Sequence, residues 1–170
     1  MATFGKTTIG GSTSPGYSPV AAYCIYNLSE AGDVSKVTFY TGGTCNMKMA
    51  IYDVSGGVPN NLLATSNPVA IGSSFAWVDF PLTISLAAGD YALCWLFDAT
   101  NYFKYDAGST NQHGYKAATY PTFPNPYGTP AANQAWAVSI YATYTPSVGG
   151  QPYISRVQQI AGMQTYNPIH

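Results

Sequence analysis

The clearest hydrophobic pattern in the chain lies between residues 87 and 98, where a turn signal precedes a run of strand-forming residues. Gly89 and Asp90 form the turn signal. The run that follows carries two alternating apolar sets, Tyr91, Leu93, Trp95 and Phe97 on one face and Ala92, Cys94 and Leu96 on the other. Apolar side chains on both faces, with no proline between them, predict a strand in the middle of a sheet that is covered on both sides.

Shorter alternating segments surround this strand and predict a chain made of strands and turns. The expected strands are residues 3–9, 20–28, 34–41, 46–53, 74–80, 82–86, 102–106, 115–120 and 135–144, with a strand end, a tight turn and a new strand in 52–65. Glycine- and proline-rich segments separate them, and 10–19 and 121–130 are predicted to be loops. Short strands at near-regular spacing predict an all-β, two-sheet antiparallel β-sandwich, jelly-roll-like in its connections.

Turn and strand-end motifs follow one another in a defined order along the chain. They are Phe4–Thr8, Leu28–Gly32, Ala50–Asp53, Gly56–Pro59, Leu62–Thr65 and Leu86–Tyr91. In this order they resemble a jelly-roll-like β-sandwich module of the kind found in bacterial surface and secreted proteins and in phage structural proteins. The resemblance covers residues 1–145. It implies an accessory, adhesive or structural role and brings no catalytic residues with it.

Composition narrows the choice of partners. The 170 residues include 8% charged and 15% aromatic residues, among them 15 tyrosines, and the formal net charge is −1. Such a composition is unlike that of a disordered chain and suits one domain with a neutral, hydrogen-bonding surface. Because the six basic residues are scattered, we expect neither a nucleic-acid nor an anionic-membrane partner. No apolar run is long enough for a transmembrane helix.

The cysteines and the first residues bear on the cellular compartment. Cys24, Cys45 and Cys94 are odd in number and lack metal-site spacing, so we expect buried small apolar side chains; the alternative is one disulfide and a leftover thiol. Residues 1–8 lack the apolar core of a signal peptide. Either the chain never enters a secretion channel, or a signal was removed and a start Met restored.

Residues that commonly carry out catalysis are sparse. Most of the seven acidic residues lie in turn contexts, where a carboxylate bonds to the local backbone. Asp98 and Asp106 bracket a short segment and would suit Ca²⁺ together with backbone carbonyls, although no Asp-x-Asp-x-Asp spacing supports such a site. We expect His113 to be solvated in a polar loop. Without a nucleophile elbow or a phosphate loop, we predict a non-enzyme with no catalytic residues, no metal and no cofactor.

Aromatic residues in the second half of the chain are the candidate binding residues. We single out Tyr102, Tyr105, Tyr115, Tyr120 and Tyr127, which lie among asparagine and glutamine residues. A tyrosine ring has an apolar face and a polar tip, which suits stacking on a sugar or packing against another protein. Alternatively, and with equal support from the sequence, these rings cover the open edge of the sandwich.

The last 25 residues differ from the body and are predicted to form a second region, 146–170. Residues 146–150 are a linker, and 155–163 would form one or two helical turns that are too short to be stable alone. We therefore expect this arm to dock, either on its own domain or, as we favour, on a neighbouring subunit or partner. The candidate arm contacts are Tyr153, Arg156, Val157, Ile160, Met163 and Tyr166.

Two functions fit these features, and from the sequence we favour the first. The first is a non-enzymatic structural or assembly protein exposed on a particle, such as a phage virion decoration or fibre protein, with other subunits of a homo-oligomer or capsid or tail proteins as partners. Virion proteins leave the cell by lysis and need no export signal. The second is a carbohydrate-binding or adhesive module of a secreted or cell-surface protein, which would use the tyrosine-rich loops to bind glycans.

Overall fold

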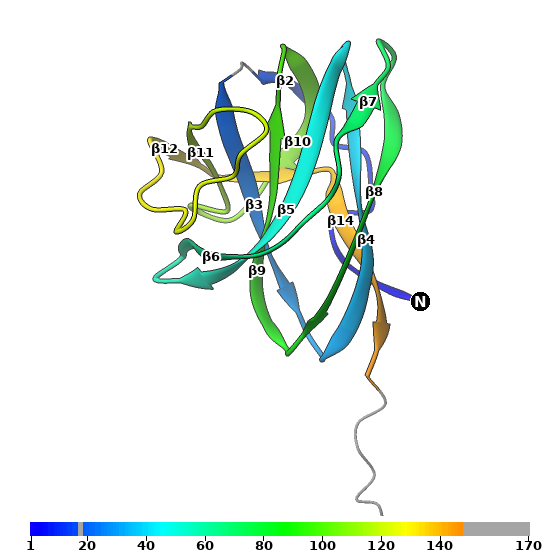
Figure 1. Ribbon diagram of the computed structural model, residues 1–170, viewed down its shortest axis with the longest axis vertical. Helices are drawn as coiled ribbons and strands as arrows, with labels where there is room; N and C mark the ends of the chain where they lie inside the picture. Colours follow the sequence, from blue (N-terminus) through cyan, green and yellow to red (C-terminus); the bar gives the residue numbers. More distant parts are fainter. Residues whose placement is uncertain (17–18, 148–170) are drawn as a thin grey trace, which may run out of the picture.

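The computed structural model describes residues 1–16 and 19–147, and within these ranges the chain forms fourteen strands and no helix. The strands pair into two antiparallel sheets that pack face to face as a sandwich, which confirms the predicted fold class (Figure 1). We name each sheet by its central strand, the β4 sheet and the β9 sheet. Within the described residues no helix is long and apolar enough to cross a membrane.

The β4 sheet is built around β4, which pairs with three other strands of the sheet. Its order is β1 (Ala2–Gly5), β14 (Ile140–Pro146), β4 (Gly32–Gly42), β10 (Asn101–Ala107) and β13 (Trp136–Val138). In addition, β2 (Ser12–Gly16) pairs with β10, and β8 (Ala76–Leu86) pairs with β4. Strands from both ends of the chain therefore meet in one sheet.

The β9 sheet contains the strand that the sequence singled out. Its order is β12 (Ala132–Gln134), β11 (His113–Ala117), β3 (Val20–Leu28), β9 (Gly89–Phe97), β5 (Cys45–Ser55) and β6 (Val58–Thr65), with β7 (Val69–Ile71) on β5. As predicted, β9 lies in mid-sheet, paired with β3 on one side and β5 on the other. Gly56 and Gly57 turn the β5–β6 hairpin with φ of 61° and 78°, a conformation that glycine adopts without strain.

The main core lies between the two sheets. Leu93, Trp95 and Phe97 of β9 meet Phe39 of β4 and Phe103 of β10 there, all nearly or fully buried. The Trp95 and Phe39 rings lie 5.0 Å apart between centroids. One face of the segment 135–144 is also in this core, where Val138, Ile140, Ala142 and Tyr144 are buried and Trp136 is half-buried.

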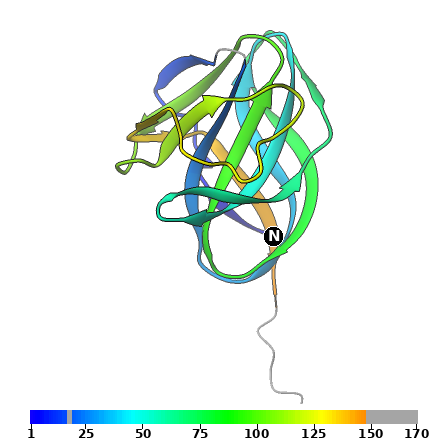
Figure 2. The same ribbon diagram turned by 60° about the vertical axis from the view of Figure 1, so that its left-hand side comes forward.

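A second, smaller core covers the outer face of the β9 sheet. The segment 118–131, which contains the predicted proline-rich loop, lies across that face (Figure 2). Its Tyr127 is fully buried edge-on between Tyr23 and Tyr52, at centroid distances of 5.3 and 5.4 Å. The Tyr127 hydroxyl donates to the carbonyl of Ala21 at 2.7 Å. This layer explains why the second face of β9, with Ala92, Cys94 and Leu96, is apolar.

Several predicted elements differ from the structure, and three of them differ because of pairing that the sequence does not show. The predicted loop 10–19 contains β2, a strand paired on one side only, which tolerates Pro15. The two strands expected at 74–80 and 82–86 are one strand, β8, and Pro81 lies where its register with β4 shifts. The strand expected at 135–144 is divided at Ser139, because β13 pairs with β10 whereas β14 pairs with β4 and β1.

The predicted C-terminal region begins where β14 ends. β14 extends through Pro146, and residues 148–170 lie outside the described residues. The candidate arm residues Tyr153, Arg156, Val157, Ile160, Met163 and Tyr166 all lie there.

Candidate functional site

The five tyrosines chosen from the sequence do not share one surface. Tyr102 is exposed on the outer face of β10, at 44% of its surface, whereas Tyr105 points inward and stacks on Trp136 at 4.0 Å. Tyr115 lines a pocket between the sheets, and Tyr120 packs against the second core. Tyr127 has no exposed surface. Their role in ligand binding stays a prediction, but the structure offers only Tyr102 as a freely exposed ring.

A different set of rings lies together on the outer face of the β4 sheet. The Trp77 ring lies 5.1 Å from Tyr40 and 5.3 Å from Tyr141, between centroids. Phe75 stacks on the far side of Tyr40 at 5.7 Å, and the Lys104 ammonium lies 5.2 Å above the Phe75 ring. All four rings are half-buried. We call Phe75, Tyr40, Trp77 and Tyr141 the outer aromatic row.

Strand register assembles this row from three strands. Tyr40 of β4 and Trp77 of β8 are direct partners, and Tyr141 of β14 is the partner of Thr38, two residues before Tyr40 on the same face. Because side chains alternate along a strand, the neighbouring Phe39 points into the core instead. Cross-strand aromatic pairs of this kind stabilise a sheet without being fully buried.

Polar groups flank the row. Asp79 accepts a hydrogen bond from Thr38 Oγ1 at 2.7 Å and forms an ion pair with Lys36 at 2.6 Å. Local desolvation raises the pKa of Asp79, but the hydrogen bonds from Lys36 and Thr38 outweigh it, so that its pKa lies below the ordinary value. The face therefore offers flat apolar rings beside an ionised carboxylate and an ammonium. Such a surface can stack on a ring and exchange hydrogen bonds with hydroxyl groups.

Sequence reasoning missed this row, although part of the signal was present. The alternation placed Tyr40 opposite Phe39, and Trp77 opposite Val78, on outward positions of their own strands. What the sequence could not supply was the strand order, because β8 and β14 are far from β4 along the chain and meet it only in the folded sheet.

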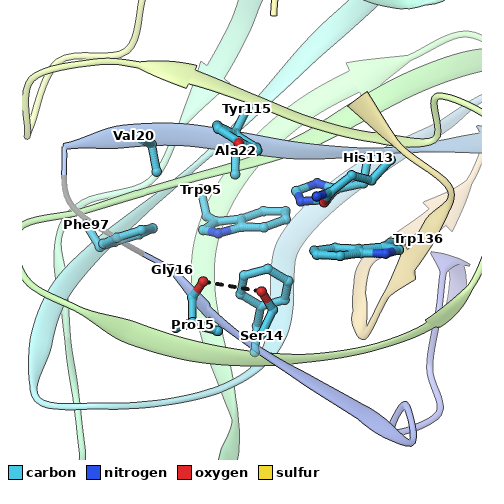
Figure 3. A pocket seen from close by; sticks show the side chains of 12 residues that line it. Ser14, Pro15, Gly16, Val20, Ala22, Trp95, Phe97, His113, Tyr115 and Trp136 are labelled. Atoms are coloured by element: carbon cyan, nitrogen blue, oxygen red, sulfur yellow. Dashed lines mark hydrogen bonds between the residues drawn. The ribbon is translucent and has the colours of Figure 1, made fainter. Parts of the chain in front are cut away.

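A pocket of about 300 Å³ lies between the two sheets at one end of the sandwich (Figure 3). Trp95, His113 and Trp136 extend along it as a nearly parallel stack, with His113 at 5.6 Å from Trp95 and 5.2 Å from Trp136. Val20 and Ala22 of β3 form part of the wall beside Trp95. The pocket is thus mainly aromatic and draws on both sheets.

His113 is not solvated, which corrects the expectation from the sequence. It is the first residue of β11, and pairing with Cys24 of β3 turns its ring into the core, where 2% of its surface is exposed. Its Nδ1 lies 2.6 Å from the carbonyl oxygen of Tyr23. Because a carbonyl only accepts, Nδ1 donates, and Nε2 is left with a lone pair. Burial lowers the pKa of His113 to about 4, so the ring is neutral at pH 7.

The two aspartates considered for calcium are held by separate partners. Asp98 accepts from the backbone and the side chain of Asn46 at 2.7 and 2.8 Å, and Asp106 pairs with Lys6 at 2.8 Å and accepts from the Gly11 amide. These bonds lower the pKa of both carboxyls. In the described part of the chain, no three His, Cys, Asp or Glu residues are grouped as a metal site.

The three cysteines are free and buried, as expected from the sequence. Burial raises the pKa of the Cys24 and Cys45 thiols to about 11. The thiols are therefore protonated at neutral pH and act as small apolar side chains.

The fold places the chain in the class of two-sheet antiparallel β-sandwiches. No protein-family model and no curated protein matches the sequence. Among solved structures, the clostridial cysteine protease Cwp84, solved after propeptide cleavage, is similar with a TM-score of 0.60 and 16% identity. The match covers 81% of this chain and 38% of that one, so this chain spans well under half of its neighbour. At this identity the likeness concerns the fold alone.

Proposed function

We propose that the chain is a non-catalytic binding module that recognises glycans through the outer aromatic row. The observation that carries the proposal is the row itself: four adjacent rings, three of them contributed by neighbouring strands, are half-buried and left without a covering layer among the described residues. On the other sheet, equivalent rings are covered by the segment 118–131.

The chemistry of the row suits a sugar. One face of a pyranose ring carries C–H groups that pack on the electron-rich face of an aromatic ring, while its hydroxyls point sideways. Trp77, at the centre of the row, would supply the stacking face, and Asp79 and Lys36 would lie beside it to bond hydroxyl groups. A rigid sheet holds these groups in place before binding, which lowers the entropic cost of association.

A non-catalytic role is part of the same proposal. The only histidine in the described residues, His113, is neutral and buried in the sandwich interior. Asp98 and Asp106 are hydrogen-bonded to different parts of the chain. These placements support a role in which the glycan is held and not cleaved.

A glycan array followed by calorimetry on the strongest hit tests the proposal. We expect Trp77→Ala and Tyr141→Ala to weaken binding at least tenfold, since stacking residues at the centre of an interface carry most of its energy. Tyr102→Ala is the matched control, because Tyr102 is exposed on the same sheet but outside the row. Binding to no glycan, or equal losses in Tyr102→Ala and Trp77→Ala, would overturn the proposal.

Assembly on a particle surface, such as a virion, is a second proposal, favoured by the unpaired edge of the β4 sheet. β8 spans Ala76–Leu86 and, among the described strands, pairs with β4 alone. A long exposed edge is a template for pairing with another chain. Light scattering on the full chain over a range of concentrations tests this role. We expect association of the full chain, and a monomer at all concentrations would contradict assembly.

A further inference from the structure

We propose that the pocket between the two sheets binds a small, uncharged, planar heterocycle that carries a hydrogen-bond acceptor and a hydrogen-bond donor on its edge. This site is separate from the outer aromatic row and does not depend on glycan binding. It is formed by β2, β3 and β9–β13, whereas the row lies on the opposite side of the β4 sheet.

The shape of the pocket selects a flat molecule. The Trp95 and His113 rings are within 11° of parallel, and the His113 and Trp136 rings within 19°. Figure 3 shows these three rings lying nearly parallel, with Phe97 on the side of Trp95 away from Trp136. A cavity of roughly 150 Å³ holds a benzene ring in other proteins. The volume of about 300 Å³ here therefore has room for two fused rings.

Unpaired polar atoms of the lining residues determine which hydrogen-bonding groups the ligand carries on its edge. Trp95 is fully buried, and its Nε1–H has no hydrogen-bond partner among the described residues. Gln134 is half-buried, and its Oε1 also has no hydrogen-bond partner among the described residues; its backbone pairs with that of His113. Native proteins rarely leave such groups unpaired. Together with the lone pair on His113 Nε2, the residues that line the pocket carry one donor and two acceptors, and the proposed ligand would reach these atoms from the pocket.

The lack of charged side chains in the described pocket lining favours a neutral ligand. No Asp, Glu, Lys or Arg belongs to the described residues that line the pocket. An ion would lose its hydration there without gaining a counter-charge, which is strongly unfavourable. A neutral lactam ring, in which N–H and C=O are adjacent, matches both the shape and the polar atoms.

Calorimetry and NMR with 2-quinolone, a neutral two-ring lactam, test the proposal. The three tryptophan indole N–H signals separate the surfaces, since Trp95 and Trp136 line the pocket and Trp77 lies in the outer aromatic row. We expect saturable binding that shifts the Trp95 and Trp136 signals and leaves Trp77 unchanged. We expect 1-methyl-2-quinolone, which lacks the N–H, to bind about tenfold more weakly.

Two matched variants test whether a loss of binding comes from the pocket itself or from a loss of folding. Val20→Phe fills the pocket without removing a polar group and should abolish binding, whereas Ile9→Phe, at an exposed position, should leave binding unchanged. Trp95→Phe keeps a ring but removes the N–H, and should weaken binding about tenfold. Three results would overturn the proposal: no binding of 2-quinolone at millimolar concentration, equal binding to Val20→Phe, or equal affinity for the N-methyl compound. Water, and not a ligand in the pocket, would then satisfy the polar atoms.

Discussion

The outer faces of the two sheets use aromatic residues in opposite ways. On the β9 sheet, Tyr23 and Tyr52 are covered by Tyr127 and Phe123 of the segment 118–131, and all four rings are buried. On the β4 sheet, Trp77 contacts both Tyr40 and Tyr141 in tilted or edge-on geometry, but all three rings stay half-exposed. One set of rings is a second core, and the other is a surface that remains available to a ligand.

This difference shows why aromatic content alone does not locate a binding site. The tyrosine-rich second half of the chain was the natural candidate, yet much of it serves to cover an apolar sheet face. A ring is available for binding only where no other segment of the chain packs over it. Substitutions on the two faces should therefore affect different properties, stability on the β9 sheet and binding on the β4 sheet.

The largest effect is expected on the covered face. Tyr127→Ala should lower the free energy of unfolding by about 3–5 kcal/mol, because it removes a fully buried ring from the second core. Tyr127→Phe keeps the ring and loses only the 2.7 Å bond to Ala21, so its cost should be about 1 kcal/mol. Urea denaturation measures both. A loss below about 1 kcal/mol for Tyr127→Ala would show that the segment 118–131 is not a core layer.

The pH dependence of the free energy of unfolding reports on His113, which is buried between the two sheets. The pKa of His113 is lowered to about 4 from its ordinary value of 6.5, so the unfolded chain binds a proton more readily than the folded one. The associated stability is fully present above pH 6.5 and is lost as the pH falls towards 4. We expect a decrease of about 3 kcal/mol over this window. Denaturation of His113→Phe should lack this component, and an unchanged pH dependence in that variant would contradict the assignment.

A smaller effect on stability is expected on the open face. Trp77→Ala removes two aromatic contacts but leaves the main core intact, so the free energy of unfolding should fall by about 0.5–1.5 kcal/mol. The same denaturation series used for Tyr127→Ala gives the comparison directly. If Trp77→Ala lowers the free energy of unfolding as much as Tyr127→Ala does, the outer aromatic row is a structural layer. The two outer faces would then not differ in role.

The smallest effect is expected at the polar flank of the row. Asp79→Asn removes the ion pair with Lys36 but keeps an oxygen that can accept from Thr38. Exposed pairs of this kind contribute about 0–1 kcal/mol. Thermal unfolding should therefore show little change at physiological salt, and a change above about 1 kcal/mol would assign Asp79 a structural role larger than its exposure suggests.

The sequence predicted those features that depend on local pattern. The two apolar faces of β9 identified a mid-sheet strand, and alternation identified β3, β4 and β5 as strands. These predictions succeed because burial on a sheet has a period of two residues, which is visible in a single strand.

Features that depend on strand pairing were not predictable. His113 lies in a polar segment, and only its pairing with β3 turns it inward. The outer aromatic row requires β8 and β14 to flank β4, which is a property of the topology. The burial of Tyr127 likewise depends on the path of a loop across a distant sheet face. In each case the decisive contact joins residues far apart in the chain.

Indole N–H NMR during titration with the strongest array-selected oligosaccharide shows which surface binds the sugar, because Trp77 and the pair Trp95 and Trp136 report on separate surfaces. We expect the Trp77 signal to shift and saturate with the sugar while the Trp95 and Trp136 signals stay in place. A sugar that shifts Trp95 or Trp136 and leaves Trp77 unmoved would contradict the assignment of the open sheet face as the binding surface.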